Sequence, residues 1–259
     1  MWTMTSESTL APGVPADYYR AIYDVEEQHW WHIGMREIAR TLLADRLKRP
    51  RSRLLDAGCG TGGFLRWAME EGEFAAGAGI DLGAAAIELA RQRVPDADLR
   101  VGSLRSLPFD DRSFDLVVTN DVLQHVPERE LPESLRELRR VLAEDGALLV
   151  RTNGARRTYR ERDDWRAFDR RSLRDALLTA GFAVERVTYA NMILSVWAAA
   201  RGRSPHAPNE TAHGIPGRGG GALRTAVGSR LLRGEARLLA RPDRTLPFGH
   251  TLFAMATPR

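Results

Sequence analysis

The fold of this chain is decided at residues 53–64, where the sequence is Arg-Leu-Leu-Asp-Ala-Gly-Cys-Gly-Thr-Gly-Gly-Phe. A short apolar run ends at an acid, Asp56, and glycines follow at alternate positions, Gly58, Gly60 and Gly62. This pattern predicts a buried strand that turns sharply into a helix. Glycines at such a turn remove the Cβ atoms that would hold a ligand away, and backbone N–H groups stay free at the helix N-terminus. We therefore expect this loop to bind a ligand.

The spacing of the glycines separates two kinds of nucleotide-binding loop. Dinucleotide-binding proteins have the pattern G-x-G-x-x-G, whereas this chain has glycines two residues apart after Asp56. The spacing resembles motif I of the class I S-adenosylmethionine-dependent methyltransferases. A second small-residue segment, 75–80, ends in Asp81 and Leu82, where that family places an acid that accepts hydrogen bonds from both ribose hydroxyls. The resemblance implies that this loop and Asp81 bind S-adenosylmethionine.

The resemblance extends over about residues 20–190 and part of the C-terminus. Residues 107–118 resemble the loop and fourth strand of the family, and 139–150 complete the pattern through strand five. One departure concerns the adenine amino group, which many relatives meet with an acid at the end of the third strand. Here Ser103 and Leu104 stand at that position. A serine oxygen still accepts the bond, so the resemblance implies a weaker contact there.

Composition limits the class of protein. The 259 residues suit one α/β domain with insertions. Lys48 is the single lysine among 38 basic residues, the net charge is only +4, and acids are interleaved with the arginines, which is typical of solvated helix faces. We therefore expect no nucleic-acid partner. Cys59 is the only cysteine, which excludes an internal disulfide, and we interpret it as a small spacer in the glycine-rich loop.

Targeting signals are not visible in the sequence. Residues 1–8 lack a basic region followed by an apolar core, and the longest near-apolar run, 190–200, is too short to span a membrane. We expect a cytoplasmic monomer or homodimer with no membrane partner.

Hydrophobic patterning predicts an α/β fold, with a Rossmann-like, seven-stranded, mostly parallel sheet flanked by helices. Strands are expected near 53–57, 75–80, 98–101, 114–119, 147–152, 183–189 and 251–256, the last antiparallel by resemblance to the family. The predicted organisation is a disordered tail at 1–16, an N-terminal helical lid at 17–50, a core at 51–190, a cap insertion at 191–249 between strands six and seven, and the final strand at 250–259.

The predicted lid carries most of the candidate substrate-binding residues. These are Tyr18, Tyr19, Tyr23, Trp30, Trp31 and His32. They either line a pocket for the methyl acceptor or form the apolar face that pins the helices down. Arg36 is suited to pair with the methionine carboxylate through two parallel hydrogen bonds; the alternative is a surface arginine. Glu26, His29 and His32 are three residues apart, but no further ligand cluster is near in sequence, so we predict no metal site.

Two more regions are predicted to face the methyl group. After strand four, the backbone at Asn120 approaches the methionine moiety by resemblance, and His125 is our candidate general base because its ordinary pKa is near neutrality. The alternative for His125 is a helix-start histidine bonded to the neighbouring loop. In the cap insertion Trp197 is our candidate for contact with substrate. The predicted cofactor-binding residues are Arg36, Asp56, Gly58, Cys59, Gly60, Gly62, Asp81, Leu82, Ser103, Leu104 and Asn120.

These features together predict a methyltransferase. It would move a methyl group from S-adenosyl-L-methionine to an O, N or C nucleophile of a small molecule, for which we expect a specialised metabolite, and release S-adenosyl-L-homocysteine. Two alternatives stay open. One is an RNA or protein methyltransferase, and the other is an accessory protein that binds the cofactor without transfer.

Overall fold

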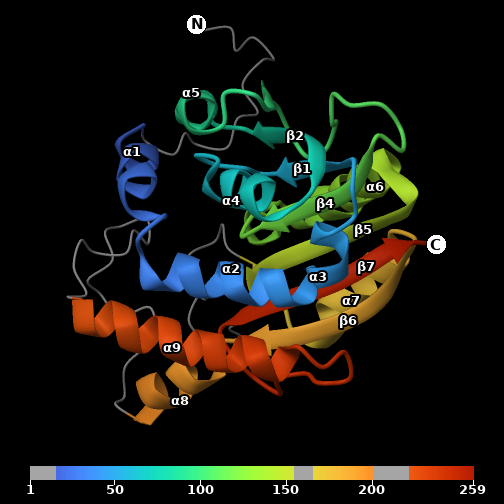
Figure 1. Ribbon diagram of the computed structural model, residues 1–259. Coiled ribbons are helices and arrows are strands. Elements are labelled where there is room, and N and C mark those ends of the chain that lie inside the picture. Colours follow the sequence, from blue (N-terminus) through green and yellow to red (C-terminus); the bar gives the residue numbers. More distant parts are fainter. Residues whose placement is uncertain (1–15, 155–165, 201–221) are drawn as a thin grey trace, which may run out of the picture.

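A single sheet organises the molecule, as the computed structural model shows (Figure 1). The structure describes residues 16–154, 166–200 and 222–259, and within them seven strands pair in the order β3-β2-β1-β4-β5-β7-β6. Strand β7 runs antiparallel to both of its neighbours, and the pairs from β3 to β5 are parallel. The predicted Rossmann-like, mostly parallel sheet is confirmed. The strands are β1 (Ser52–Ala57), β2 (Phe74–Asp81), β3 (Asp98–Val101), β4 (Phe114–Asn120), β5 (Leu142–Asn153), β6 (Phe182–Ala190) and β7 (Thr251–Pro258).

Helices cover both faces of this sheet. The α-helices are α1 (Ala16–Val25), α2 (Trp30–Leu42), α3 (Ala44–Leu47), α4 (Gly63–Glu71), α5 (Ala84–Arg93), α6 (Leu131–Val141), α7 (Arg170–Thr179), α8 (Met192–Ala200) and α9 (Ala222–Leu239). Two short 3-10 helices, η1 (Leu123–His125) and η2 (Glu128–Glu130), follow β4. Helix α7 begins with a capping box between Asp169 and Ser172 and is followed by Gly181 at a positive φ, which explains its sharp ends.

Alternate residues of each central strand enter two different cores. On β1, Leu55 and Ala57 pack with α6 and α7, whereas Leu54 packs with α2, α4, α5 and α9. Because successive side chains of a strand point to opposite faces, an apolar run such as that of β1 requires helices on both sides. The result is a three-layered α/β/α arrangement.

Helix α9 lies beside α2 across one face of the sheet (Figure 1). Its side chains Leu232, Ala236 and Leu239 are buried in the same core as Met35 and Ile38 of α2. One part of the predicted cap insertion, residues 222–239, is therefore a packing helix. Residues 201–221 of that insertion and residues 1–15 of the predicted tail lie outside the described residues, so the cap and the tail stay predictions.

Helix α1 lies beyond the ends of β1 and β2 toward which their arrows point (Figure 1), and it contacts α5. That edge is where parallel strands end, and ligands of open α/β sheets bind there. Residues 17–25 of α1 are all exposed or half-buried, in contrast to the four buried residues of α2. Across the described residues, each helix falls short of the length and apolarity that a membrane crossing needs.

Candidate functional site

The glycine-rich loop is open to a ligand at one position and tightly packed at another. Gly58, Gly60 and Gly62 have φ angles of 89°, 52° and 81°, a region that favours glycine. A Cβ at Gly58 would overlap the side chain of Val122 in the loop after β4. A Cβ at Gly60 would meet no described atom within 4 Å. Gly58 thus lets two loops approach each other, and the backbone of Gly60 is bare.

Asp81, the predicted ribose acid, is held by two backbone donors. Its Oδ2 accepts from the Gly60 N–H at 2.9 Å, and its Oδ1 accepts from the Gly83 N–H at 2.8 Å. Burial raises the pKa of Asp81, and both N–H bonds oppose that rise. Each carboxylate oxygen keeps a further lone pair for a ligand hydroxyl. The side chain is therefore fixed in orientation before a ligand binds.

Tyr19, a predicted substrate-binding residue, lies next to Gly83, whose N–H donates to Asp81. Its hydroxyl is so close to Gly83 that a Cβ there would overlap it. Burial, and next the charge of Asp81, raise the pKa of the Tyr19 phenol. The structure thus brings α1 onto the β1–β2 end of the sheet edge.

Three further predicted cofactor-binding residues, Leu82, Ser103 and Leu104, follow the ends of β2 and β3. Ser103 Oγ accepts from the Arg105 N–H at 3.2 Å, and its second lone pair is left for another donor. Leu82 is 44% exposed, whereas Leu104 is buried in the core. Leu82 therefore offers an apolar surface at the edge, and Leu104 anchors the loop after β3 in the hydrophobic core.

Asp56 and Cys59 are buried at the end of β1. Asp56 Oδ1 has no hydrogen-bond partner among the described residues. Burial raises the pKa of Asp56 to about 7, while Arg151 opposes and Asp81 adds to the rise. Burial also raises the pKa of Cys59 well above its ordinary value, which keeps the thiol protonated. This agrees with the interpretation of Cys59 as a spacer.

The end of β4 supplies polar groups of a different kind. Both side-chain amide atoms of Asn120 are buried without a partner among the described residues. The next residue, Asp121, has a φ of 58° and pairs with Arg151 of β5. Asp121 Oδ2 accepts from Arg151 Nε at 3.0 Å and from Nη2 at 2.7 Å. A buried cation and its partner acid thus lie at the end of β4, where Asn120 is the register partner of Arg151.

Three of the predicted lid residues gather around this ion pair. The Arg151 guanidinium carbon is 5.0 Å from the ring centroid of Trp31, whose ring meets that of His32 edge-on at 5.0 Å. Burial and the charge of Arg151 lower the pKa of His32 well below its ordinary value, so the imidazole is neutral at neutral pH. Burial and Asp121 raise the pKa of Tyr18. Tyr18, Trp31 and His32 therefore share one wall of the site.

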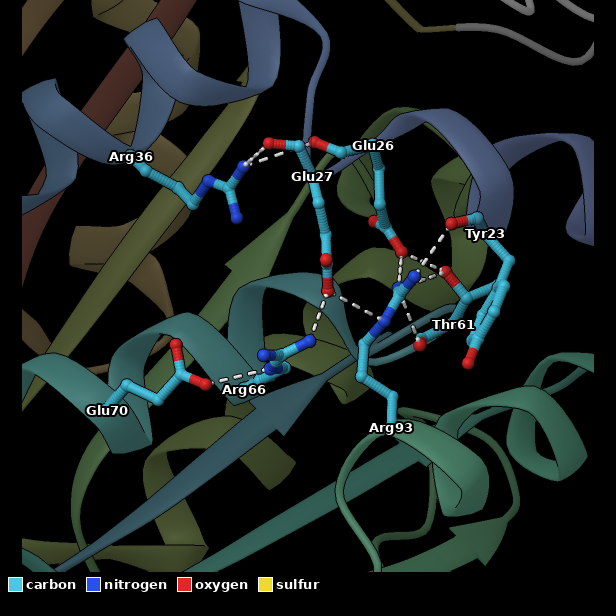
Figure 2. A network of polar contacts seen from close by, with 8 residues as sticks. All are labelled: Tyr23, Glu26, Glu27, Arg36, Thr61, Arg66, Glu70 and Arg93. Atoms are coloured by element: carbon cyan, nitrogen blue, oxygen red, sulfur yellow. Dashed lines mark hydrogen bonds and ion pairs between the residues drawn. The ribbon is translucent and has the colours of Figure 1, made fainter.

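Other predicted residues point elsewhere. Trp30 packs against Gly228 of α9, and Tyr23 lies under the guanidinium of Arg93 at 4.0 Å. Arg36 donates from Nη2 to the backbone carbonyls of Glu26 and Glu27, at 3.2 and 3.0 Å (Figure 2). Its predicted role toward a carboxylate stays a prediction. Trp197 belongs to α8, but its side chain lies outside the described part of the chain.

His125 ends the 3-10 helix η1 and is exposed. The neighbouring Gln124 is buried, and its Oε1 accepts from the Asn153 N–H at 2.8 Å, which ties η1 to the end of β5. His125 is thus at the carboxyl end of β4, where the sequence predicts it. Its role as a base stays a prediction.

Neither Asp121 nor Arg151 is predicted from the sequence to be a site residue. A signal for Arg151 is present, because an arginine that directly follows the buried apolar run 147–150 must find a partner. Nothing in the sequence identifies that partner as Asp121, since the pairing depends on the register of β4 against β5.

S-adenosylmethionine fits these groups. Asp81 presents two fixed oxygens, the backbone at Gly60 is open, and the buried amide of Asn120 has unused donors and acceptors within the described structure. A family model described as a methyltransferase domain matches residues 55–150. The chain carries a class I S-adenosylmethionine-dependent methyltransferase domain.

Known proteins resemble the chain over different lengths. The malonyl-[acyl-carrier protein] O-methyltransferase of Halorhodospira halophila is 32% identical over 181 residues, which is 63% of this chain and 60% of that protein. The chain spans less than two thirds of this relative and of those from Serratia marcescens and Methylococcus capsulatus, at 60%, 51% and 60% of their lengths.

Two solved structures share the fold of this methyltransferase domain. The PH0226 protein of Pyrococcus horikoshii has a TM-score of 0.61 at 16% identity and covers 95% of this chain and 100% of its own. The geranyl diphosphate C-methyltransferase of Streptomyces coelicolor has a TM-score of 0.52 at 18% identity, with 85% and 78% covered. That enzyme was solved in complex with S-adenosyl-L-homocysteine.

Proposed function

We propose that the protein transfers a methyl group from S-adenosylmethionine to an O, N or C nucleophile of a small molecule, with a specialised metabolite as our candidate. The observation that carries this proposal is the shared sheet edge. The fixed carboxylate of Asp81 and the bare Gly60 backbone lie at the same edge as the Asn120 amide and the wall of Trp31 and Arg151. A donor site and an acceptor site would then be neighbours.

The chain's own residues divide the work of binding. Asp81 would hold the ribose, Ser103 the adenine amino group, and the glycine loop with Arg36 the methionine moiety. When bound, S-adenosylmethionine supplies an electrophilic methyl group on a sulfonium. Catalysis by the protein then consists chiefly of alignment of the acceptor and exclusion of water.

Aromatic and polar groups at the ends of β4 and β5 would hold the acceptor. The rings of Tyr18 and Trp31 suit an apolar or aromatic portion. His32 is held neutral and accepts a hydrogen bond, but a pKa well below its ordinary value makes it a weak base. A base for an acceptor that must lose a proton is therefore left to His125.

A second candidate acceptor is a carboxylate carried on a protein. The observation that favours it is Arg151, a cation in this wall whose ion pair with Asp121 uses Nε and one terminal nitrogen. A guanidinium has five N–H donors, so donors beyond this pair suit a carboxylate. Relatives named malonyl-[acyl-carrier protein] O-methyltransferase motivate the same candidate.

Label transfer tests both candidates. The purified protein is incubated with methyl-labelled S-adenosylmethionine and three acceptor panels: small molecules with hydroxyl or amine groups, dicarboxylic acids free or linked to a carrier protein, and RNA. Mass spectrometry then locates the label. We expect label on the first panel; label on the carrier-linked acids alone would favour the second candidate. Cofactor binding by calorimetry with no label in any panel would favour an accessory protein.

A further inference from the structure

The connection between α1 and α2 lies directly on the glycine-rich loop. The Glu26 carboxylate is hydrogen-bonded to the hydroxyl of Thr61, the residue between Gly60 and Gly62, and it pairs with Arg93 at the end of α5 (Figure 2). Both ends of the ion pair are shielded from water, since the side chain of Glu26 is 13% exposed and that of Arg93 is 3% exposed. Removal of one partner of such a buried pair leaves an uncompensated charge, which strongly destabilises the folded protein.

Arg93 connects three segments that are distant in sequence. Its Nη1 donates to the Thr61 carbonyl at 3.0 Å, and its Nη2 donates to the Tyr23 carbonyl at 2.7 Å. Its guanidinium carbon also lies 4.0 Å from the centroid of the Tyr23 ring. The N-terminal helices, the glycine loop and α5 therefore meet on one side chain (Figure 2).

Gly63, the first residue of α4, leaves the space that Glu26 occupies. A Cβ at Gly63 would overlap the Glu26 carboxylate. The carboxylate thus lies against the N-terminus of α4, where the helix dipole favours a negative charge. Gly63 has an ordinary helical backbone, so the Glu26 side chain is what requires a small residue at this position.

The geometry points to a positioning role for these three residues, which we call the latch: Glu26, Thr61 and Arg93. We propose that the latch sets the glycine loop for cofactor binding by holding the α1–α2 connection against it. The link to the cofactor is direct in the chain, because Gly60, next to Thr61, donates its N–H to Asp81 at 2.9 Å. Displacement of Thr61 would move Gly60 and release one of the two donors that fix Asp81.

The inference rests on the cofactor site proposed above, and one series of variants tests it. Glu26→Gln and Arg93→Met remove the charges of the latch. Calorimetry with S-adenosyl-L-homocysteine should show affinity weaker by about tenfold in each, a loss within the usual range for coupled sites. In an assay with an acceptor, KM for S-adenosylmethionine should rise while kcat stays within about twofold, because the latch does not touch the reacting atoms.

Arg66→Met is the matched control. Arg66 pairs with Glu27 and Glu70 beside the latch, at 2.8 Å in both cases, but the three side chains are 40–61% exposed. Exposed pairs contribute little. Its affinity for S-adenosyl-L-homocysteine should stay within about twofold of wild type.

Gly63→Ala covers the case in which Arg93→Met fails to fold. Alanine is a better helix former than glycine, so the change alone favours α4. Its methyl group must nevertheless displace the Glu26 carboxylate, and we expect weaker cofactor binding. In a Glu26→Ala background the methyl has room, and Gly63→Ala should cause no further loss of affinity.

The outcomes separate the latch from the proposed function. A wild-type protein that binds no S-adenosyl-L-homocysteine overturns the proposed cofactor site. Folded Glu26→Gln and Gly63→Ala variants that bind as wild type does, with only the thermal midpoint lowered, overturn the latch as a positioning device. Equal losses from Gly63→Ala with and without Glu26 would also contradict it.

Discussion

The β1–β2 side and the β4–β5 side of the sheet edge are supplied with polar groups in different ways. On the β1–β2 side the groups are a backbone loop and one acid, and Gly60 and Asp81 are 21 residues apart. On the β4–β5 side the groups are side chains from α1, α2, β4 and β5, brought together around Arg151. A backbone site is fixed by local chain geometry, whereas a side-chain site varies with each residue. The first suits a ligand common to a family, and the second suits an acceptor particular to one protein.

The largest effect is expected from a substitution on the β4–β5 side that leaves the β1–β2 side intact. His125→Ala should lower turnover by about 10² to 10⁴, the range for loss of a general base, if the acceptor must lose a proton. Affinity for S-adenosyl-L-homocysteine should be unchanged by calorimetry. Glu128→Ala, an exposed neighbour in η2, is the control. Turnover within a few-fold of wild type would mean that alignment alone is sufficient.

The next effect concerns Asp56 on β1, the strand that pairs with both β2 and β4. Its pKa is raised to about 7, so between pH 4 and 7 the folded state holds a proton that the unfolded state releases. This group's contribution to stability is therefore lost as pH rises through that window, by about 1.4 kcal/mol for each pH unit. Asp56→Asn should remove that slope, so its free energy of unfolding relative to wild type rises from pH 4 to 7.

Chemical denaturation of both proteins at several pH values checks this. The difference between the two proteins isolates Asp56 from the other acids. A difference that does not vary with pH would show that Asp56 is ionised in the folded protein throughout.

A smaller effect is expected on the β1–β2 side. Asp81→Ala removes a charged acceptor of hydrogen bonds, each worth about 1.5 to 3 kcal/mol, so affinity for S-adenosyl-L-homocysteine should fall at least about tenfold. Asp98→Ala, at the exposed start of β3, is the control. Unchanged affinity in a folded Asp81→Ala variant would remove the ribose assignment.

The smallest effect distinguishes the two N-terminal helices, α1 at the sheet edge and α2 across one face of the sheet. Residues 17–25 of α1 are not buried, whereas α2 buries Gly34, Met35, Ile38 and Ala39. Cofactor binding should slow hydrogen exchange in α1, because a lightly packed helix gains most from a new contact. Exchange in residues 35–42 should stay the same. Equal exchange with and without cofactor in both helices would make α1 static packing as well.

The succession of strands and helices along the chain and the candidate residues on the β1–β2 side follow from the sequence alone. Alternating apolar runs, the glycines after Asp56 and the acid at the end of the next strand are short-range features. Neighbouring residues determine them, because strand periodicity and turn geometry extend over only a few positions. For that reason the glycine loop and Asp81 could be assigned by resemblance, and the structure joins them by a hydrogen bond.

The tertiary structure decided which distant side chains meet. Glu26 and Arg93 are 67 residues apart, and Asp121 and Arg151 are 30 apart. Their pairing depends on strand register and on the packing of α1 and α2 against the sheet. The same holds for Trp30 and Trp31, neighbours in sequence, of which one packs on α9 and the other faces Arg151. A sequence pattern states that a side chain is aromatic or charged, but only the packed helix determines which group it touches.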